Sequence, residues 1–337
     1  MKTWTINSFG VENLSLNETA PQEPKGDKIA VDVQALSLNY RDLMVVKGMY
    51  NPKLKLPATP ISDGAGVVAA VGRDVTRFQP GDRVVSHFIP AWTDGPFSGD
   101  YGKSSLGTPG PGLAAEQVVL PERAWVKVPE SYSFAQAATL PIAALTAWSS
   151  LVTEGRLQEG ETVLTLGTGG VSIFALQLAK AMGAKVIITS SKKEKMARAV
   201  ELGADHAINY AEDPEWEKNV LDVTDGRGAD LVVETGGAAT LNQSMRACKP
   251  GGRLAILGAL TGLQSDISTA LILMKRLTLC GIYVDSRAHF EKMNEFLESE
   301  KIQPVIDKEY DFAALPDALH SMARGEHFGK IVVRVAK

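Results

Sequence analysis

Residues 161–191 read ETVLTLGTGGVSIFALQLAKAMGAKVIITSS, and this segment carries the clearest fold signal of the chain. It opens with a short apolar run at residues 163–166, which is typical of a buried strand and ends at a glycine cluster. From Val171 onward the apolar residues recur at helical spacing until Gly183, a helix stop signal. A second apolar run at residues 185–190 predicts another strand. The stretch therefore predicts one strand–helix–strand unit with parallel strands.

The glycine cluster between the first strand and the helix matches a dinucleotide-binding fingerprint. Gly167 and Gly169 lack the Cβ that would keep a pyrophosphate away from the backbone, and a helix start offers free N–H groups. Ser172 takes the place of the third glycine. A plain tight turn is the alternative interpretation. The predicted cofactor-binding residues of this turn are Gly167, Thr168, Gly169, Gly170, Val171 and Ser172.

The end of the second strand favours NADP(H) over NAD(H). An NAD-binding unit places an acidic residue about 20 residues after its first glycine, where it binds the ribose 2′-hydroxyl. Residues 189–193 read TSSKK and contain no acid. The hydroxyls of Ser190 and Ser191 and the neighbouring ammonium groups suit a 2′-phosphate instead. A solvated helix start is the alternative interpretation, although lysines are unfavourable near the positive end of a helix.

Length and composition limit the function classes. A chain of 337 residues predicts two domains, and a net charge of −4 gives no reason to expect nucleic acid or an anionic membrane as a partner. No apolar run is long enough to span a bilayer, and the opening MKTWTINSFG does not resemble a signal peptide. Cys248 and Cys280 are interpreted as buried thiols in a reducing compartment, which predicts a cytoplasmic protein.

The residues before the fingerprint are β-like. Short runs at residues 28–38, 61–71, 83–86, 115–120 and 124–128, punctuated by Gly and Pro, predict a small barrel. Between them, residues 88–113 form a long loop, interpreted as a rim or lid. Its Trp92 and Phe97 either contact substrate or anchor the loop. Residues 134–154 are helical in composition, with a break at Pro141.

Helices and strands alternate after the fingerprint. Strands are predicted at residues 206–210, 231–234, 252–258 and 277–284, with helices at 194–202 and 238–248. Together with the fingerprint unit they predict an α/β fold with a doubly wound parallel sheet. The last strand is apolar and would end the sheet, which predicts a homodimer through its edge. The remaining residues predict helices at 290–298 and 316–324 and strands at 304–307 and 330–335.

Five segments resemble a known family. They are DGAGVVAAVG at residues 63–72, VTRFQPGDRV at 75–84, LPIAALTAW at 140–148, GTGGVS at 167–172 and ELGADHAINY at 201–210. With these segments, essentially the whole chain resembles the medium-chain dehydrogenase/reductase superfamily. The resemblance implies a GroES-like β-barrel catalytic domain at residues 1–130, completed by residues 285–337. It also implies a Rossmann NADP(H)-binding domain at residues 131–284, with substrate bound in the cleft between the domains.

The chain departs from the zinc-dependent members of that family. Asn39-Tyr40-Arg41-Asp42 stands where they carry Cys-x-x-Asp, Ile61-Ser62-Asp63 stands where they carry Gly-His-Glu, and residues 88–113 hold no cysteine. Catalytic zinc needs convergent Cys, His and carboxylate ligands. The five histidines, His87, His206, His289, His320 and His327, match no ligand spacing. We therefore predict no metal, a pattern similar to the zinc-free quinone oxidoreductases and their enone-reducing relatives.

The resemblance also implies roles for single residues. Asn39 and Asp42 match a quinone reductase motif near the nicotinamide, Tyr50 an aromatic position at the substrate mouth, and Thr146 a threonine that approaches the nicotinamide. The predicted catalytic residues are Asn39, Tyr40, Asp42, Tyr50 and Thr146. The further cofactor-binding residues are Ser190, Ser191, Lys195 and Tyr210 at the 2′-phosphate, Gly236, Gly258, Leu260, Ile282 and Val284 at later strand ends, and Phe328 and Lys330 on the returning strand. Alternatively, Asp42 braces the barrel, Tyr40 and Tyr50 are packing residues, and Asp63 makes a structural hydrogen bond.

Three functions follow from these patterns. The first is NADPH-dependent, metal-independent reduction of a quinone or an α,β-unsaturated carbonyl, whose conjugation delocalises the developing charge so that hydrogen-bond donors suffice. The second is a zinc-free alcohol dehydrogenase or carbonyl reductase. The third is an NADPH-binding protein without significant turnover. The expected partners are a small carbonyl, enone or quinone substrate and a second copy of the chain.

Overall fold

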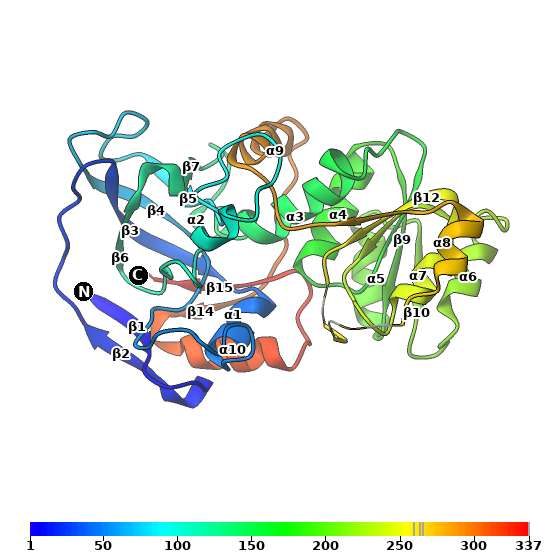
Figure 1. Ribbon diagram of the computed structural model, residues 1–337, viewed down its shortest axis with the longest axis horizontal. Coiled ribbons are helices and arrows are strands. Elements are labelled where there is room, and N and C mark those ends of the chain that lie inside the picture. Colours follow the sequence, from blue (N-terminus) through cyan, green and yellow to red (C-terminus); the bar gives the residue numbers. More distant parts are fainter. Residues whose placement is uncertain (259, 263, 265, 336–337) are drawn as a thin grey trace. The chain divides into compact units, whose positions relative to one another are not determined.

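The computed structural model describes residues 1–258, 260–262, 264 and 266–335. Its contacts divide the chain into two compact units (Figure 1). The first unit comprises Met1–Leu145 and the chain from Asp285 onward, and the second comprises Thr146–Val284. The chain leaves the first unit and later returns to it, so residues far apart in the sequence complete one sheet there.

The second unit contains the predicted parallel sheet. Within the described residues its strands are β8 (Thr162–Thr165), β9 (Lys185–Ser190), β10 (His206–Asn209), β11 (Ala229–Glu234), β12 (Cys248–Ile256) and β13 (Thr278–Gly281). Their order is β10-β9-β8-β11-β12-β13, and all neighbouring pairs are parallel. This is the order of a Rossmann sheet, and the order reverses between β8 and β11, where such sheets bind ligands. The predicted α/β fold is confirmed.

Short helices link these strands. They are α4 (Gly170–Ala181), α5 (Lys193–Glu201), α6 (Trp216–Asp222), α7 (Leu241–Ala247) and α8 (Thr269–Lys275). Helix α4 packs on β8 and β9, and α7 packs on β11 and β12. The apolar core beneath them includes Leu164, Val232 and Leu254. Helices α6 and α8 were not predicted.

The first unit is built on a seven-stranded sheet. Its strands are β3 (Lys28–Ser37), β4 (Asp63–Val71), β5 (Arg83–Ser86), β6 (Gln117–Pro121), β7 (Trp125–Lys127), β14 (Ile306–Asp311) and β15 (Lys330–Arg334). One side of β3 pairs with two strands: residues 28–32 pair with β6, and residues 35–37 pair with β15. Ser37, at the end of β3, pairs with Asp63 of β4 and with Val332 of β15. The end of β3 therefore meets the starts of β4 and β15.

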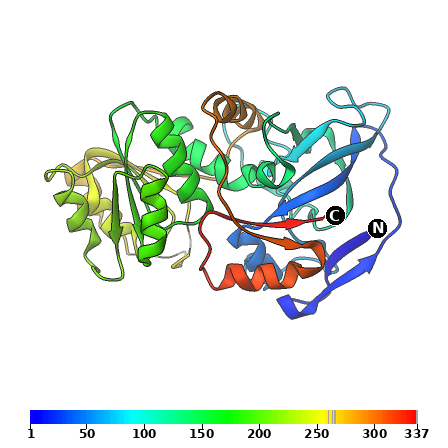
Figure 2. The ribbon, with the colours of Figure 1, turned by 180° about the vertical axis from the view of Figure 1, so that it is seen from behind.

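Smaller elements surround this sheet (Figure 2). They are the antiparallel pair β1 (Lys2–Ile6) and β2 (Leu14–Glu18), and the helices α1 (Tyr40–Val46), α2 (Phe134–Ala137), α9 (Arg287–Ser299) and α10 (Leu315–Ala323). Short 3₁₀ turns lie at Val11–Asn13, Tyr101–Ser104, Glu122–Ala124 and Phe312–Ala314. β1, β2 and α1 were not predicted. No helix in the described part of the chain is long and apolar enough to cross a membrane.

Residues 134–153 form consecutive helical segments. After α2 come a π-helical turn at Leu140–Ala144, α3 (Leu145–Trp148) and a second π-helical turn at Ser149–Thr153. Pro141 lies at the start of the first π-helical turn and does not end the helical path. The compact units change at Leu145, beyond residue 130, because α2 packs on β3 and β4.

The long loop at residues 88–113 anchors itself through its aromatic side chains. The ring of Trp92 is largely buried and lies 5.1 Å from the ring of Phe97 and 6.3 Å from that of Tyr101. Its indole N–H donates a hydrogen bond of 2.8 Å to the carbonyl of Gly95. These contacts favour the anchoring interpretation of Trp92 and Phe97.

Candidate functional site

The fingerprint turn lies between β8 and α4 and is open on its glycine side. Gly167 has a φ of 71°, which a residue with a Cβ rarely adopts. A Cβ built on Gly167 or Gly169 would meet no atom within 4 Å, so protein packing does not require these glycines. The first N–H groups of α4 have no acceptor within the helix. The turn therefore offers N–H donors and the empty space that a pyrophosphate needs.

Two of the remaining fingerprint residues, Thr168 and Ser172, are buried. Gly170 and Val171 begin α4. The Ser172 hydroxyl donates a hydrogen bond of 2.6 Å to the carbonyl of Leu166. The serine at the third glycine position thus ties the helix to the end of β8.

The carboxyl end of β9 presents hydroxyls and lysines. Ser190 is buried, and its hydroxyl accepts a hydrogen bond of 3.4 Å from the backbone N–H of Lys192, whereas Ser191 is exposed. Lys195 is half-buried in the first turn of α5. Tyr210 directly follows Asn209, which pairs with Ser190, and its side chain is exposed. Ser191 and Tyr210 therefore lie at one edge of the sheet, and the structure brings this predicted group together.

The residues predicted to bind the cofactor at the later strand ends are two glycines and three apolar residues. A Cβ on Gly258 would lie 1.7 Å from the carbonyl oxygen of Thr235, and one on Gly236 would lie 2.3 Å from the Thr240 hydroxyl, so packing demands both glycines. Leu260 is exposed, whereas Ile282 and Val284 are buried. Both lie beyond β13, which ends at Gly281 and is shorter than the predicted strand at residues 277–284.

A buried carboxylate that was not predicted shapes the turn after β11. Glu234 accepts hydrogen bonds from the backbone N–H groups of Gly236 and Gly237, at 2.8 and 2.9 Å, and from the Thr240 hydroxyl at 2.7 Å. The Ser244 hydroxyl also donates to it. This network explains why α7 begins at Leu241 and not at residue 238. The only signal in the sequence was an acidic residue ending an apolar strand.

In the first unit, Asn39, Asp63 and Lys330 form a buried polar cluster. The Asn39 amide nitrogen donates to Asp63 at 2.8 Å, and its amide oxygen accepts from the Lys330 ammonium at 2.7 Å. The ammonium also donates to the carbonyl of Leu38 at 2.6 Å. The second Asp63 carboxyl oxygen, Oδ1, is buried and has no hydrogen-bond partner in the described residues. These three residues meet because the end of β3 adjoins the starts of β4 and β15.

Burial shifts the protonation of this cluster. It raises the pKa of Asp63 to about 7, an effect that the positive charge of Lys330 opposes and the charge of Asp42 reinforces. Burial also lowers the pKa of Lys330, while Asp63 and Asp42 act in the opposite direction. The cluster thus holds a carboxyl group that titrates near neutral pH beside a buried cation. Lys330 was predicted to contact the cofactor, whereas the structure gives it these protein partners.

Asp42 braces the start of α1. It accepts a hydrogen bond of 2.9 Å from the backbone N–H of Asn39 and one of 2.6 Å from the Ser62 hydroxyl. Arg41 donates to the Ser62 hydroxyl and to the carbonyls of Leu106 and Thr108, at 3.0 and 3.2 Å for the two carbonyls. These contacts support the bracing interpretation of Asp42. Arg41 and Ser62 were not predicted as site residues.

The two tyrosines of the predicted set are accessible. Tyr40 and Tyr50 are both partly exposed, and the guanidinium of Arg41 lies 4.7 Å from the centre of the Tyr50 ring. Within the described residues neither phenol has a hydrogen-bond partner, so both remain available to a ligand. Thr146 belongs to the second unit and is buried, and its carbonyl accepts a hydrogen bond of 2.7 Å from Ser150. Phe328 is buried in the first unit.

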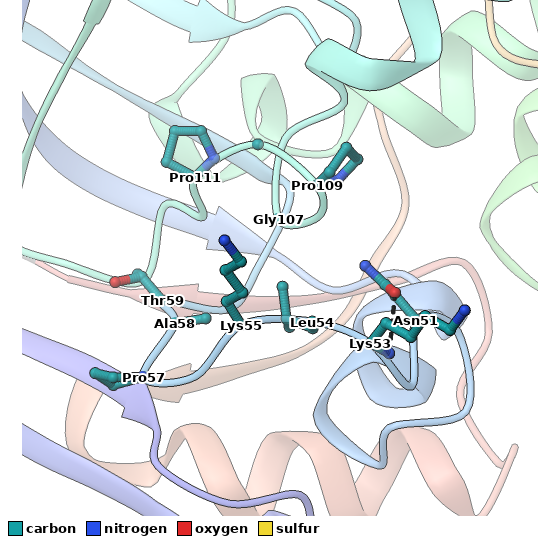
Figure 3. A pocket seen from close by; sticks show the side chains of 11 residues that line it. Asn51, Lys53, Leu54, Lys55, Pro57, Ala58, Thr59, Gly107, Pro109 and Pro111 are labelled. Carbon is teal, nitrogen blue, oxygen red and sulfur yellow. Dashed lines mark hydrogen bonds between the residues drawn. The ribbon is translucent and has the colours of Figure 1, made fainter.

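A hollow of about 470 Å³ lies in the first unit, just beyond Tyr50 in the sequence. Figure 3 shows the side chains that line it. Residues of segments 51–59 and 107–111 line it, and none of the lining residues is acidic. The side chain of Lys55 extends into the hollow, on the side facing Pro111 (Figure 3). Asn51 connects the two segments through a hydrogen bond of 3.1 Å to the Thr108 hydroxyl. The hollow is therefore a positively charged recess.

Comparisons with known proteins identify the family. The alcohol dehydrogenase GroES-like domain family matches residues 25–130, and the zinc-binding dehydrogenase family matches residues 170–299. A zinc-type alcohol dehydrogenase-like protein of Schizosaccharomyces pombe is 40% identical over 94% of this chain and 93% of its own length. A quinone oxidoreductase of Pseudomonas aeruginosa is 31% identical over 96% of each chain. A crystal structure of an NAD-dependent alcohol dehydrogenase covers 100% of both chains with a TM-score of 0.91 and 34% identity.

This chain belongs to the medium-chain dehydrogenase/reductase family, in its zinc-type alcohol dehydrogenase-like and quinone oxidoreductase-like branch. It is an oxidoreductase of a family that binds a nicotinamide cofactor. The open fingerprint turn fits such a cofactor, because its backbone N–H groups and bare glycines face empty space.

The residues at the metal positions do not fit zinc. Asn39 and Ser62 replace the thiolate and imidazole that zinc prefers, and Asp63 bonds to Asn39. The Lys330 ammonium lies 2.7 Å from the Asn39 amide oxygen, and a positive charge there opposes a divalent cation. Among the described residues, no group of three or more His, Cys, Asp or Glu side chains is arranged to hold a metal ion. His87, the one buried histidine, has its pKa lowered by burial to about 4 and bonds to the Trp92 carbonyl at 3.1 Å.

Proposed function

We propose that this protein is an NADPH-dependent, metal-independent reductase of quinones or α,β-unsaturated carbonyls. The observation that carries the proposal is the Asn39–Asp63–Lys330 cluster, in which the Asn39 amide joins the Asp63 carboxyl group to the Lys330 ammonium group. A saturated ketone needs strong polarisation of its oxygen before reduction. A conjugated acceptor needs less, because its developing charge is delocalised, and hydrogen-bond donors are sufficient.

The preference for NADPH is supported by the carboxyl end of β9. Residues 189–193 contain no acid to bind a ribose 2′-hydroxyl. Ser191 and Tyr210 are exposed at the same sheet edge, and Lys195 lies in the adjoining first turn of α5. A hydroxyl, a phenol and an ammonium group together suit a phosphate dianion. We propose that these three residues bind the 2′-phosphate.

We assign the proposed roles from the hydrogen-bonding groups that each side chain has available to a ligand. When bound, the cofactor supplies the hydride, and one proton from solvent completes the two-electron reduction of the acceptor. The Asn39 amide bonds to both Asp63 and Lys330, so we assign it a positioning role at the start of α1. Tyr40, the first residue of α1, and Tyr50 have free phenols. We propose that one or both donate a hydrogen bond to the acceptor oxygen.

An alcohol dehydrogenase or carbonyl reductase is the second candidate. The names of two relatives favour it, because one is a zinc-type alcohol dehydrogenase-like protein and another an NAD-dependent alcohol dehydrogenase. That reaction would require the donors of the first unit to polarise a saturated carbonyl without conjugation. A protein that binds NADPH without turnover is the third candidate, and the acceptor assays below also test it.

Steady-state oxidation of NADPH and of NADH should be measured with a naphthoquinone, an enone and a saturated aldehyde. We expect the highest kcat/KM with NADPH and a conjugated acceptor. Turnover confined to the aldehyde would replace this proposal with the second candidate. Tight NADPH binding without oxidation by any acceptor would replace it with the third. The Tyr40→Phe and Tyr50→Phe variants, assayed at saturating NADPH, test the proposed donors, and unchanged kcat in both would remove them from the mechanism.

We also propose that the protein forms a homodimer through the edge of the second unit. β13 is an edge strand of the six-stranded sheet, and Leu273 and Met274 of the adjoining α8 are 78% and 83% exposed. Exposed apolar side chains beside an unpaired edge favour association with a second copy. Cys280 lies in this edge and is half-buried, not fully buried as predicted from the sequence. Sedimentation velocity at several concentrations tests the proposal, and a monomer at every concentration contradicts it.

A further inference from the structure

Three hydroxyl groups converge on the single peptide bond that opens the fingerprint turn. Its carbonyl, on Leu166, accepts hydrogen bonds of 2.6 Å from Ser172 and 2.7 Å from Thr235. Its N–H, on Gly167, donates a hydrogen bond of 3.1 Å to the Thr189 hydroxyl. The peptide is therefore held at both ends of its dipole, and no charged group takes part.

The three hydroxyls come from three different elements. Thr189 lies in β9, and Thr235 directly follows β11. These strands flank β8 on its two sides in the sheet, while Ser172 lies in the first turn of α4. The peptide is thus fixed against both neighbouring strands and the helix. A rotation of this peptide would break all three hydrogen bonds together.

The position of Thr235 is itself fixed by its neighbours Glu234 and Gly258. Buried Glu234 accepts hydrogen bonds from the backbone N–H groups of Gly236 and Gly237 and so folds the turn that carries Thr235. On its other side the Thr235 backbone adjoins Gly258, where an added Cβ would lie 1.7 Å from the Thr235 carbonyl oxygen. Gly258 was predicted to contact the cofactor. Its glycine identity is explained by this close approach.

We propose that Thr189 and Thr235 are positioning residues for the dinucleotide, a proposal that rests on the nucleotide binding proposed above. Gly167, at a φ of 71°, is conformationally permissive, so the open turn has alternatives that would point its N–H groups away from a pyrophosphate. The hydroxyls hold the binding conformation before the ligand arrives. Such preorganisation reduces the conformational entropy that is lost on binding.

This assignment also separates two functions within the carboxyl end of β9. Thr189 is buried, and its hydroxyl is used by Gly167, so it does not face the ribose. The neighbouring Ser191 is exposed and remains available for the 2′-phosphate. The strand end therefore holds the turn with one residue and contacts the cofactor with another.

The test compares Thr189→Val and Thr235→Val with the matched control Thr165→Val. Thr165 lies one residue before Leu166 in β8, and its hydroxyl is buried without a hydrogen-bond partner in the described residues. NADPH affinity should be measured by fluorescence titration and the melting temperature in the absence of nucleotide. We expect the Kd for NADPH to rise about three- to tenfold in each of the first two variants, as the loss of one hydrogen bond predicts. In Thr165→Val it should stay within about twofold.

Two further measurements distinguish a positioning role of these threonines from a general loss of structure in the variants. The Thr189→Ser and Thr235→Ser variants keep the hydroxyl and should bind NADPH like the native protein. The KM for a quinone at saturating NADPH should not change in any variant. Equal Kd values in native and valine variants, or equal losses in serine and valine variants, would overturn the proposal. Native protein that fails to bind NADPH would instead refute the proposed function.

Discussion

The fingerprint turn of the second unit and the buried cluster of the first unit are built in opposite ways. The turn is held by neutral hydroxyls on one peptide bond, and its glycine side is open. The cluster buries an ammonium group, a carboxyl group and an amide, and each of its hydrogen bonds stays within the protein. Substitutions in the two regions should therefore have different effects. Damage to the turn should affect ligand affinity, whereas damage to the cluster should affect folding.

The largest effect is expected when the cation is removed from the cluster. In Lys330→Met, the Asn39 amide oxygen and the Leu38 carbonyl lose their donor, and Asp63 loses its nearby positive charge. Breaking a buried charged network by deleting one partner costs about 3–5 kcal/mol. Denaturant unfolding should show a loss of this size. The control Lys308→Met, at an exposed position of β14, should change the free energy of unfolding by less than about 0.5 kcal/mol. Equal stabilities of the two variants would contradict the account.

A smaller effect, on NADPH affinity alone, is expected at the carboxyl end of β9. In Ser191→Asp a carboxylate faces the proposed 2′-phosphate, and juxtaposed like charges oppose binding. We expect the Kd for NADPH to rise about tenfold or more, while that for NADH changes little. The melting temperature without nucleotide should stay unchanged. Ser299→Asp, at an exposed position in the first unit, serves as the control for added charge. A parallel loss of both nucleotides would remove Ser191 from the phosphate site.

A pH-dependent effect on stability is expected at Asp63. Its pKa of about 7 in the folded state lies above the value of 3.8 for the free side chain, so the folded protein binds this proton more tightly. The resulting stability is fully present below about pH 4 and is lost as the pH rises to about 7. In Asp63→Asn this pH dependence disappears. Relative to the native protein, the variant should therefore gain stability between pH 4 and 7, and unfolding at several pH values measures the difference. A constant difference would place the pKa of Asp63 outside this window.

The smallest effect on either region is expected from the proposed dimer surface. Leu273→Glu places a charge on an exposed part of α8, where it does not disturb the core. The free energy of unfolding of the isolated chain should change little, whereas the dimer should dissociate at a higher concentration. Sedimentation of native and variant protein at equal concentrations measures this. Identical profiles would exclude α8 from the interface.

The two regions also differ in how far the sequence predicts them. The turn is local, because strand, glycines, helix and second strand follow one another within residues 161–191, and every predicted element was found. The parallel sheet followed from the alternation of strands and helices. The cluster joins residues 39, 63 and 330, and only the pairing of β3 with β4 and β15 brings them together. No local pattern in the sequence contains that information.

Individual residues show where local patterns were insufficient. Asn39 was placed among the catalytic residues, although its amide bonds to Asp63 and Lys330. Gly258 was assigned to the cofactor, although its close approach to Thr235 explains why a glycine is needed. Thr189 was read only as part of an acid-free stretch, and its hydrogen bond to Gly167 depends on the register between β8 and β9. In each case the missing information was the identity of a partner on another element.

The central claim is that a buried cation and amide, and not a metal ion, occupy the polar site of the first unit in an NADPH-dependent reductase. The most direct test measures zinc by elemental analysis in the same preparation whose NADPH oxidation with a naphthoquinone is assayed. We expect substoichiometric zinc and a rate that does not change after dialysis against a chelator. Stoichiometric zinc, with a rate that falls on its removal and returns on its addition, would contradict the central claim.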